Sequence, residues 1–293
     1  MTTIKIRALT EKEVYKPAVN KEEGKIDHLS ASQVNTFLSC PVKWYFSYVR
    51  GIKIPPSIAF VFGRAIHSGL ENIYRHKQQG KKFNKTEVLD LVETKFEEEA
   101  QDVDASTKSE KIAQKIKAVN IMEQYIDNKC PDEVPDESIE AVEAERKIKL
   151  YDATAKTMVD VIVKQDLILK DRIRDFKTSK GIPSEIPQKY KLQLALYAIE
   201  GSKPKAEIEF LAKTKAFKRE IVTLSVQDLK YNKNALPATF LAAWKQMRTI
   251  AAIKDLDELI AKKILLPTGL SSDWACKYCA YGEQGFCPFY MRG

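Results

Sequence analysis

Residues 175–181, DFKTSKG, carry two charged side chains at a spacing that could do chemistry. They follow the run LILKDRIR and are predicted to end a β-strand. Because side chains on a strand alternate between its two faces, Asp175 and Lys177 point the same way. Such a pair is often only a surface ion pair, which contributes little to stability. Beside further ligands, the same two groups could bind a metal ion and stabilise charge on a phosphate.

A second carboxylate lies on the predicted strand TMVDVIV, residues 157–163. If this strand neighbours the one that carries Asp175, Asp160 and Asp175 meet at one end of the sheet beside Lys177. Converging carboxylates repel unless a cation lies between them, and hard oxygen ligands suit Mg²⁺ or Mn²⁺. Such an ion could activate water against a phosphodiester, while Lys177 positions the water or neutralises charge on the scissile phosphate.

A predicted helix could supply a further ligand. The segment IAFVFGRAIHSGLENIYRHK, residues 58–77, has apolar residues at three- and four-residue steps, so His67 and Glu71 share one helical face. His67 could give the metal ion a nitrogen ligand. Glu71 could orient the imidazole from its place one turn further along the helix.

The remaining pattern predicts a mixed α/β core, in which these residues are held by alternating helices and strands. Residues 1–27 are polar and read as irregular. Strands are predicted at 142–151, 157–163, 166–171, 172–178, 205–214 and 217–225. Further helices are predicted at 31–39, 111–129, 184–201 and 226–263, the last with a break near Pro237.

The charge distribution suggests a polyanionic partner. The net charge is +8, and residues 41–85 hold nine Lys or Arg against one acid, with aromatic residues between them, which suits phosphates and stacked bases. Lys81, Lys82 and Lys85 are the candidate DNA-binding residues of this stretch. No run approaches roughly 18 uninterrupted apolar residues, and the N-terminal stretch lacks the apolar region of a signal peptide. We therefore expect a cytoplasmic protein without a membrane segment.

The five cysteines form a second candidate site. Cys276, Cys279 and Cys287 are spaced C-x2-C-x7-C, and Cys40 stands alone near the other end of the chain. In a chain expected to be intracellular, disulfides are an improbable framework. Four thiolates could bind Zn²⁺ or a [4Fe–4S] cluster, and spacing alone does not decide between them. Cys130 lies apart and is interpreted as a bystander.

Four motifs, FGRAIHSGLE, VDV, DFKT and QLALY, stand in an order that resembles the RecB-family nucleases of the PD-(D/E)XK superfamily. The resemblance is to the subgroup with an iron–sulfur cluster, which includes AddB-type nuclease domains and CRISPR-associated RecB-like exonucleases. It spans the chain from about Leu29 and implies a restriction-endonuclease-like mixed sheet core flanked by helices, with an iron–sulfur staple. One departure is Met158, where the family often has a glycine two residues before its first metal aspartate.

The resemblance also implies roles for individual residues. His67, Asp160 and Asp175 would bind the metal ion with the Phe176 carbonyl, and Lys177 would be the catalytic lysine. Gln193 and Tyr197, one helical turn apart, would hold the lysine, the water or the DNA strand. The cysteines of a [4Fe–4S] cluster that ties the two ends of the domain together would be Cys40, Cys276, Cys279 and Cys287.

We therefore predict a DNA nuclease that uses Mg²⁺ or Mn²⁺, with exonuclease action on single-stranded or end-bearing DNA implied by the resemblance. The alternative is a DNA-binding or assembly module that keeps the fold but acts with a helicase or integrase partner. An intact set of His67, Asp160, Asp175 and Lys177 argues against that alternative. The predicted segments are an N-terminal extension, a helical region, the nuclease core, and C-terminal helices with the cysteines, at residues 1–28, 29–135, 136–225 and 226–293.

Overall fold

The computed structural model describes residues 4–8, 19–20, 25–26, 28–103, 107–152, 156–200, 203–214, 216–253, 255–267, 276 and 279–290. The chain divides into two compact units. Unit 1 comprises Met1–Ile54, Glu145–Val163 and Lys233–Gly293, and unit 2 comprises Pro55–Ala144 and Lys164–Asn232. The predicted segments 29–135, 136–225 and 226–293 are each divided between the two units, and only 1–28 lies within one of them. Each unit combines stretches that lie far apart in the chain.

Unit 2 holds the part of the sheet that includes β7 (Arg172–Ser179), the strand with Asp175 and Lys177. Its strands are the first part of β5 (Ile139–Asp152), the second part of β6 (Thr157–Leu169), β7, β8 (Lys205–Ala212) and β9 (Arg219–Thr223). β7 runs antiparallel to β6 and parallel to β8, and β9 runs antiparallel to β8. A parallel pair needs a crossover connection, which α6 (Gln188–Glu200) supplies between β7 and β8.

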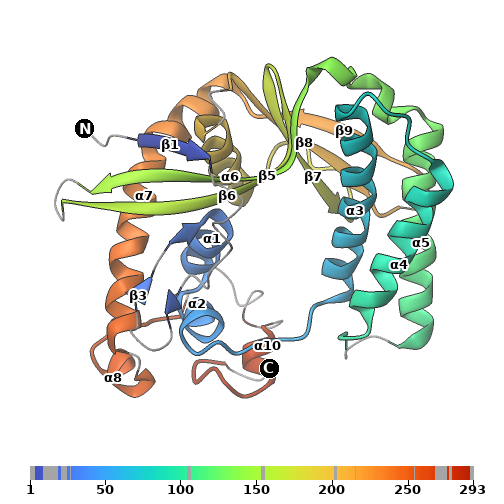
Figure 1. Ribbon diagram of the computed structural model, residues 1–293. Coiled ribbons are helices and arrows are strands. Elements are labelled where there is room, and N and C mark those ends of the chain that lie inside the picture. The colour runs from blue at the N-terminus through green and yellow to red at the C-terminus, as the bar shows by residue number, and fades with distance from the viewer. Residues whose placement is uncertain are drawn as a thin grey trace. The chain divides into compact units, whose positions relative to one another are not determined.

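Three helices of unit 2 pack against one another in a layer, visible in Figure 1: α3 (Ile58–Gln78), α4 (Lys85–Ala100) and α5 (Lys108–Asp127). Each begins at a residue whose side chain accepts a hydrogen bond from a backbone N–H of the first turn, namely Ser57, Asn84 and Thr107. Two 3₁₀ turns, η2 (Cys130–Glu133) and η3 (Asp136–Ser138), lead from α5 into β5. The sequence pattern predicted α5 and α6 at nearly these places.

Consecutive residues of β7 show that α3 and α6 cover opposite faces of the sheet. The Phe176 ring stacks on Tyr74 of α3 with ring centroids 5.6 Å apart. The Lys177 Nζ atom instead lies 5.5 Å from the ring centroid of Tyr190 in α6. Phe176 thus belongs to the apolar core beneath α3, together with Ile66 and other buried side chains of the helical layer. This burial fixes which way the neighbouring charged residues point.

Unit 1 is assembled from three stretches of chain. β1 (Ile4–Ala8) pairs antiparallel with the second part of β5, β4 (Leu29–Ser30) pairs parallel with the first part of β6, and β2 (Val19–Asn20) pairs with β3 (Lys25–Ile26). Its helical elements are α1 (Ala31–Ser39), α2 (Pro41–Trp44), the π-helical turn η1 (Tyr45–Val49), most of α7 (Val226–Ile253), α8 (Leu256–Ala261) and α10 (Ala280–Glu283).

Two features of unit 1 differ from the sequence prediction. Residues 4–8, 19–20 and 25–26 were expected to be irregular but form β1, β2 and β3, because short strands can be held by backbone pairing alone. The break expected near Pro237 is absent, and α7 runs through this residue. Leu236 and Phe240, on either side of the proline, are fully buried, so packing offsets the lost backbone hydrogen bond. None of the described helices is long and apolar enough to span a membrane.

Candidate active site

The centre of the candidate site is a contact between α3 and the sheet of unit 2. The Nε2 atom of His67 donates a hydrogen bond to the Phe176 carbonyl oxygen at 2.9 Å. Its Nδ1 atom lies 3.5 Å from the Asp166 carboxylate, which in turn accepts a hydrogen bond from the Phe176 backbone N–H at 2.8 Å. An imidazole, a carboxylate and a backbone carbonyl, all metal-ligand types, therefore converge at one place.

Glu143 of β5 adds a second carboxylate to this group. Ligand atoms of His67, Glu143 and Asp166 all lie within 4.8 Å of one another. Glu143 has a positive φ of 50°, a backbone conformation that a residue with a side chain rarely adopts inside a strand. The carboxylate also pairs with Lys164 at 2.7 Å. The sequence analysis did not find Glu143, because the unusual backbone angle that presents it here leaves no mark in the residue pattern.

Asp175 and Lys177 lie beside these ligands and form the ion pair that their spacing predicted. Asp175 is only 2% exposed, so its charge is isolated from water. On α6, the Gln193 side-chain amide donates to the Tyr197 hydroxyl at 2.6 Å. Burial raises the pKa of Tyr197 well above its ordinary value, and the negative charge of Asp175 acts in the same direction. Tyr197 and its partner Gln193 therefore lie within electrostatic range of Asp175, and their role toward the lysine, the water or the DNA strand stays a prediction.

Burial and neighbouring charges shift the pKa values of three groups at this site. Burial raises the pKa of the Asp166 carboxyl well above its usual range, and the nearby charge of Asp175 adds to the effect. Burial lowers the pKa of the His67 imidazole, and the positive charge of Lys177 also lowers it. Burial alone would lower the pKa of Lys177, but Asp175 and Asp166 outweigh it, and the pKa is raised. Two close carboxylates and a neutral imidazole are what a divalent cation requires.

The donor set fits a hard divalent cation. His67 Nε2 and the Phe176 carbonyl oxygen share a hydrogen bond, and both would become ligands once an ion replaces the proton on Nε2. The oxygen atoms of Asp166, Asp175 and Glu143 would complete a mostly oxygen set, which favours Mg²⁺ or Mn²⁺ over a thiolate-binding metal.

Asp160, the predicted first metal aspartate, is not part of this group. It lies in unit 1, where its carboxylate oxygens are 3.3 Å from Lys147 Nζ and 3.6 Å from Lys149 Nζ. The antiparallel register that pairs Leu167 with Arg174 places Asp166, not Asp160, opposite Asp175. The sequence analysis took residues 157–163 and 166–171 as separate strands, whereas both belong to β6. The aspartate beside His67 is therefore six residues later than expected.

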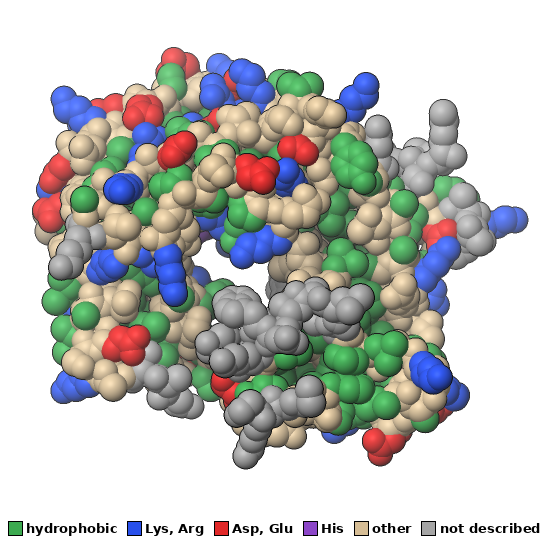
Figure 2. Space-filling model, turned by 180° about the vertical axis from the view of Figure 1, so that it is seen from behind, with side chains coloured by type: hydrophobic (Ala, Val, Ile, Leu, Met, Phe, Trp, Pro, Cys, Tyr) green, Lys and Arg blue, Asp and Glu red, His purple; other side chains and the backbone are tan. Residues whose placement is uncertain are grey.

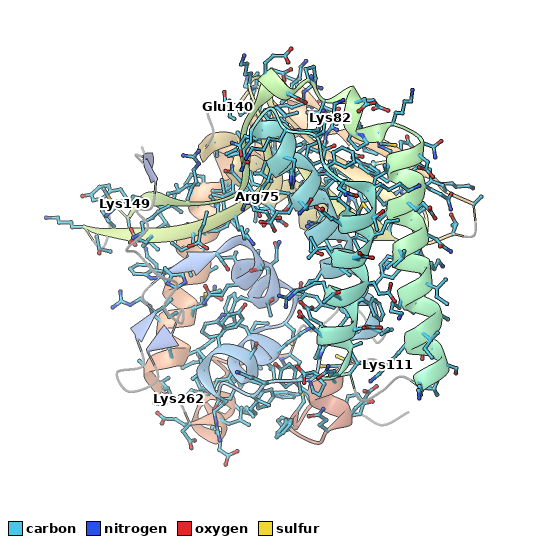
Figure 3. All side chains as sticks on the ribbon, turned by 45° about the vertical axis from the view of Figure 1, so that its right-hand side comes forward. Arg75, Lys82, Lys111, Glu140, Lys149 and Lys262 are labelled. Carbon is cyan, nitrogen blue, oxygen red and sulfur yellow. The ribbon has the colours of Figure 1, made fainter. Side chains whose placement is uncertain are left out.

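The predicted supporting residues have other partners. Glu71 was expected to orient His67 but pairs with Arg75 one turn further along α3, at 2.7 Å, and Asp166 is the carboxylate at the imidazole. Lys81 and Lys82 are exposed in the connection that follows α3. Figure 3 shows Lys82 at one end of the helical layer and Lys111 at the other. Lys85, the third lysine of this set, is already paired with Asp127 at 2.7 Å and Glu123 at 3.1 Å.

Most aromatic residues of the basic stretch cannot stack on nucleic-acid bases. Trp44, Tyr45, Phe46 and Tyr74 are all at most 3% exposed and belong to the cores of their units. Lys and Arg side chains are interspersed with Asp and Glu over the face shown in Figure 2. Neither the aromatic residues nor the net charge alone therefore outlines a binding surface.

The cysteines of the second candidate site are all described, and none of the five forms a disulfide. Burial raises the pKa of the Cys287 thiol, and the thiols of Cys279, Cys40 and Cys276 act on it in the same direction. All four residues lie in unit 1. The Phe46 ring, close after Cys40, stacks on Tyr281 of the C-terminal segment with centroids 5.6 Å apart. Cys130 is buried in unit 2, apart from these contacts.

Comparison with known proteins identifies the superfamily of this chain. Residues 28–288 match the PD-(D/E)XK nuclease superfamily. The chain belongs to this superfamily. A crystal structure of a Eubacterium rectale protein named "putative exonuclease" is similar to it, with a TM-score of 0.56 and 13% identity over 83% of this chain and 87% of that one. The protein SSO0001 aligns over 89% of this chain and 97% of its own at 11% identity, with a TM-score of 0.32. No curated protein sequence matches.

Membership of the PD-(D/E)XK superfamily confirms the predicted fold class, a mixed sheet with helices on both faces. It also identifies the protein as a nuclease of a metal-dependent type. The low identity to the Eubacterium rectale protein means that the comparison shows a shared fold, and the chemistry of the site has to be argued from the residues themselves.

Proposed function

We propose that this protein is a metal-dependent deoxyribonuclease that acts as an exonuclease on single-stranded or end-bearing DNA. The observation that carries the proposal is the convergence of His67, Asp166 and the Phe176 carbonyl beside the Asp175–Lys177 ion pair. The fold shared with the Eubacterium rectale protein, whose name includes exonuclease, supports the preference for DNA ends. A binding module would not need a half-buried set of metal ligands next to a lysine.

The metal ion would be held by His67, Asp166, Asp175 and the Phe176 carbonyl, with Glu143 as a further carboxylate. When bound, Mg²⁺ or Mn²⁺ supplies Lewis-acid activation of the phosphodiester and of water. The chain's own contribution is positioning. The hydrogen bond from the Phe176 N–H fixes the Asp166 carboxylate, and burial keeps bulk water from competing with the ligands.

Lys177 would act as a fixed positive charge next to the scissile phosphate. Its ion pair with Asp175 holds the ammonium group at the ligand cluster, where it can offset the negative charge that develops during hydrolysis. Tyr197, with its hydroxyl held by Gln193, would limit the motion of this lysine and of Asp175 from the α6 side. Two elements on opposite faces of the sheet would therefore support one reaction centre.

A [4Fe–4S] cluster bound by Cys40, Cys276, Cys279 and Cys287 is the second part of the proposal. Its support is the spacing of the cysteines in the sequence and the location of all four in unit 1. The cluster would have a structural role, because it would join the segment after α1 to a C-terminal segment with few buried apolar residues of its own.

The test is a digestion time course on end-labelled single- and double-stranded DNA with Mg²⁺, Mn²⁺ or EDTA. We expect metal-dependent shortening from an end, and loss of cleavage by roughly a hundredfold or more in Lys177→Ala and Asp175→Ala. Circular single-stranded DNA separates exonuclease from endonuclease action. Near-normal cleavage by either folded variant would overturn the assignment of the site.

A further inference from the structure

An exposed aromatic side chain lies at the edge of the candidate active site. Phe60, in the first turn of α3, is 55% exposed, although phenylalanine side chains are usually buried. It lines a cavity of about 520 Å³ in unit 2 together with Gly63, Arg64, His67 and Lys177. Single exposed apolar residues are common on protein surfaces. Phe60 differs from such residues because it shares its cavity with the proposed metal ligands.

The periodicity of α3 places Phe60 in line with the metal-binding histidine. Residues at positions 60, 64, 67 and 71 follow steps of four, three and four, so they lie along one face of the helix. Seven residues separate Phe60 from His67, which corresponds to about 10 Å along the helix axis. Between them, Gly63 also lines the cavity and adds no side chain to its wall. This face of α3 can therefore accept a chain that runs from the metal site to the ring.

Positive charges accompany the ring. The Arg64 guanidinium carbon is 5.7 Å from the centroid of the Phe60 ring. Glu99 of α4 holds this arginine with its carboxylate 3.1 Å from the Nε atom, and it lies 3.2 Å from Lys95 Nζ. Both cations line the cavity. These two cations and Glu99 carry a net charge of +1, so a phosphodiester chain along this wall would find a positive excess for its phosphates and an aromatic face for one of its bases, the combination that binds single strands.

We propose that the Phe60 ring is a stacking platform for an unpaired nucleobase near the scissile phosphate, which makes single-stranded DNA the substrate of the site. This inference rests on the proposed nuclease function and names its substrate class. Bases inside a duplex have both faces covered by their neighbours, whereas an unpaired base offers a free face to the ring.

The test uses a series of fluorescently labelled single-stranded oligonucleotides of mixed sequence. Each carries one abasic residue, at a different position in each oligonucleotide. Binding is measured by anisotropy with Ca²⁺ and the full-length Asp175→Asn protein, so that the result does not depend on cleavage. Cleavage of the same oligonucleotides is then measured with Mn²⁺ and the protein that retains Asp175. Phe60→Ala, Phe60→Trp and the control Tyr231→Ala are compared in both backgrounds. Tyr231 is 67% exposed in unit 2 and does not line the cavity.

We expect Phe60→Ala to weaken binding of the intact oligonucleotide roughly five- to a hundredfold, the range observed when a base-stacking aromatic residue is replaced by alanine. At one abasic position the protein with Phe60 should lose a similar factor, and Phe60→Ala should lose nothing further there. Phe60→Trp and Tyr231→Ala should bind normally. If an abasic residue weakens DNA binding equally at every position, both in the protein with Phe60 and in Phe60→Ala, the inference is overturned.

The two proposals fail in different ways. If the protein does not cleave any DNA with Mg²⁺ or Mn²⁺ but shows the position-specific loss of binding, the nuclease proposal fails and the platform stands. If it cleaves single-stranded DNA and Phe60→Ala cleaves it equally well with unchanged binding, the platform fails and the nuclease stands. Preference for fully paired ends over unpaired ends in both assays would also overturn the platform.

Discussion

The carboxylate of Asp166 accepts a hydrogen bond from the backbone N–H of Phe176, so a side chain on β6 takes the place of a backbone partner for β7. Because the carbonyl oxygen of the same Phe176 faces His67 at 2.9 Å, one residue links the imidazole and the carboxylate. The burial of the Phe176 ring against Tyr74 fixes this link in the apolar core. Packing of the Phe176 ring therefore positions the backbone N–H and carbonyl groups that meet Asp166 and His67.

Replacement of two aspartates of β6 should separate the active-site residue from the sequence candidate. Asp166→Asn removes a charged ligand that is hydrogen-bonded to Phe176, and we expect cleavage to fall roughly a hundredfold or more. Asp160→Asn disrupts only contacts with Lys147 and Lys149, and cleavage should remain within a few-fold. Rates on end-labelled DNA at saturating Mn²⁺ measure both. A larger loss of cleavage in Asp160→Asn than in Asp166→Asn would instead assign Asp160 as the metal ligand.

Glu143→Gln should weaken metal binding while leaving the fold intact. The substitution keeps the size of the side chain and removes one charge from the group with His67 and Asp166, so we expect roughly a 10- to 100-fold loss in Mn²⁺ affinity. Isothermal titration with Mn²⁺ measures the change. Glu71→Gln is the matched control, because Glu71 pairs with Arg75 and should leave the affinity unchanged. An effect of Glu71→Gln as large as that of Glu143→Gln would contradict the proposed ligand set.

The cysteine site predicts a coloured protein. Anaerobically purified protein should be brown with broad absorption near about 400 nm, and Cys287→Ser should lose iron, colour and thermal stability together. Cys130→Ser removes a buried thiol with no role in the site and should retain the iron and the colour. Metal analysis and absorption spectra of the unchanged protein, Cys287→Ser and Cys130→Ser measure the iron content and the colour. A colourless, stable and active protein with one equivalent of zinc would replace the cluster by a zinc site.

The lysines after α3 should differ in their contribution to DNA binding. Lys81 and Lys82 are exposed, and replacement of both by Gln should reduce the slope of log affinity against log salt by up to about two units, since each phosphate contact contributes roughly one. Lys85→Gln should change the slope less, because this lysine is occupied by Asp127 and Glu123. Salt titrations followed by anisotropy measure the slopes. An unchanged slope in the double variant would assign these lysines to ordinary solvation.

Lys213 should make stability depend on alkaline pH. Burial lowers its pKa to about 8, and the positive charge of Lys117 acts in the same direction. Between pH 8 and its unfolded pKa of about 10.4, the unfolded chain holds more protons, so this group makes the free energy of unfolding rise with pH. Lys213→Met should therefore raise Tm at pH 7 and have no such effect above about pH 10. The exposed Lys218→Met is the control, and a gain that persists at high pH would contradict the assignment.

Much of the fold could be predicted from local patterns. The helix at 31–39 begins and ends where the spacing of apolar residues placed it, and Ser30 caps it as expected of a serine before such a run. The pairing of Asp175 with Lys177 follows from the two-residue repeat of a strand, which depends only on backbone geometry. The motif order also sufficed to identify the superfamily, to which residues 28–288 belong.

The composition of the site was decided by tertiary structure. Asp160 and Asp166 are both aspartates of one strand, and only the register between β6 and β7 determines which of them faces Asp175. Glu143 reaches the site through a positive φ in β5, and Phe60 reaches its edge through the packing of α3 on β7. Register and packing depend on contacts between residues distant in the chain. The sequence by itself therefore determined the chemistry that this protein can perform, and the tertiary structure decided which of several equivalent residues performs it.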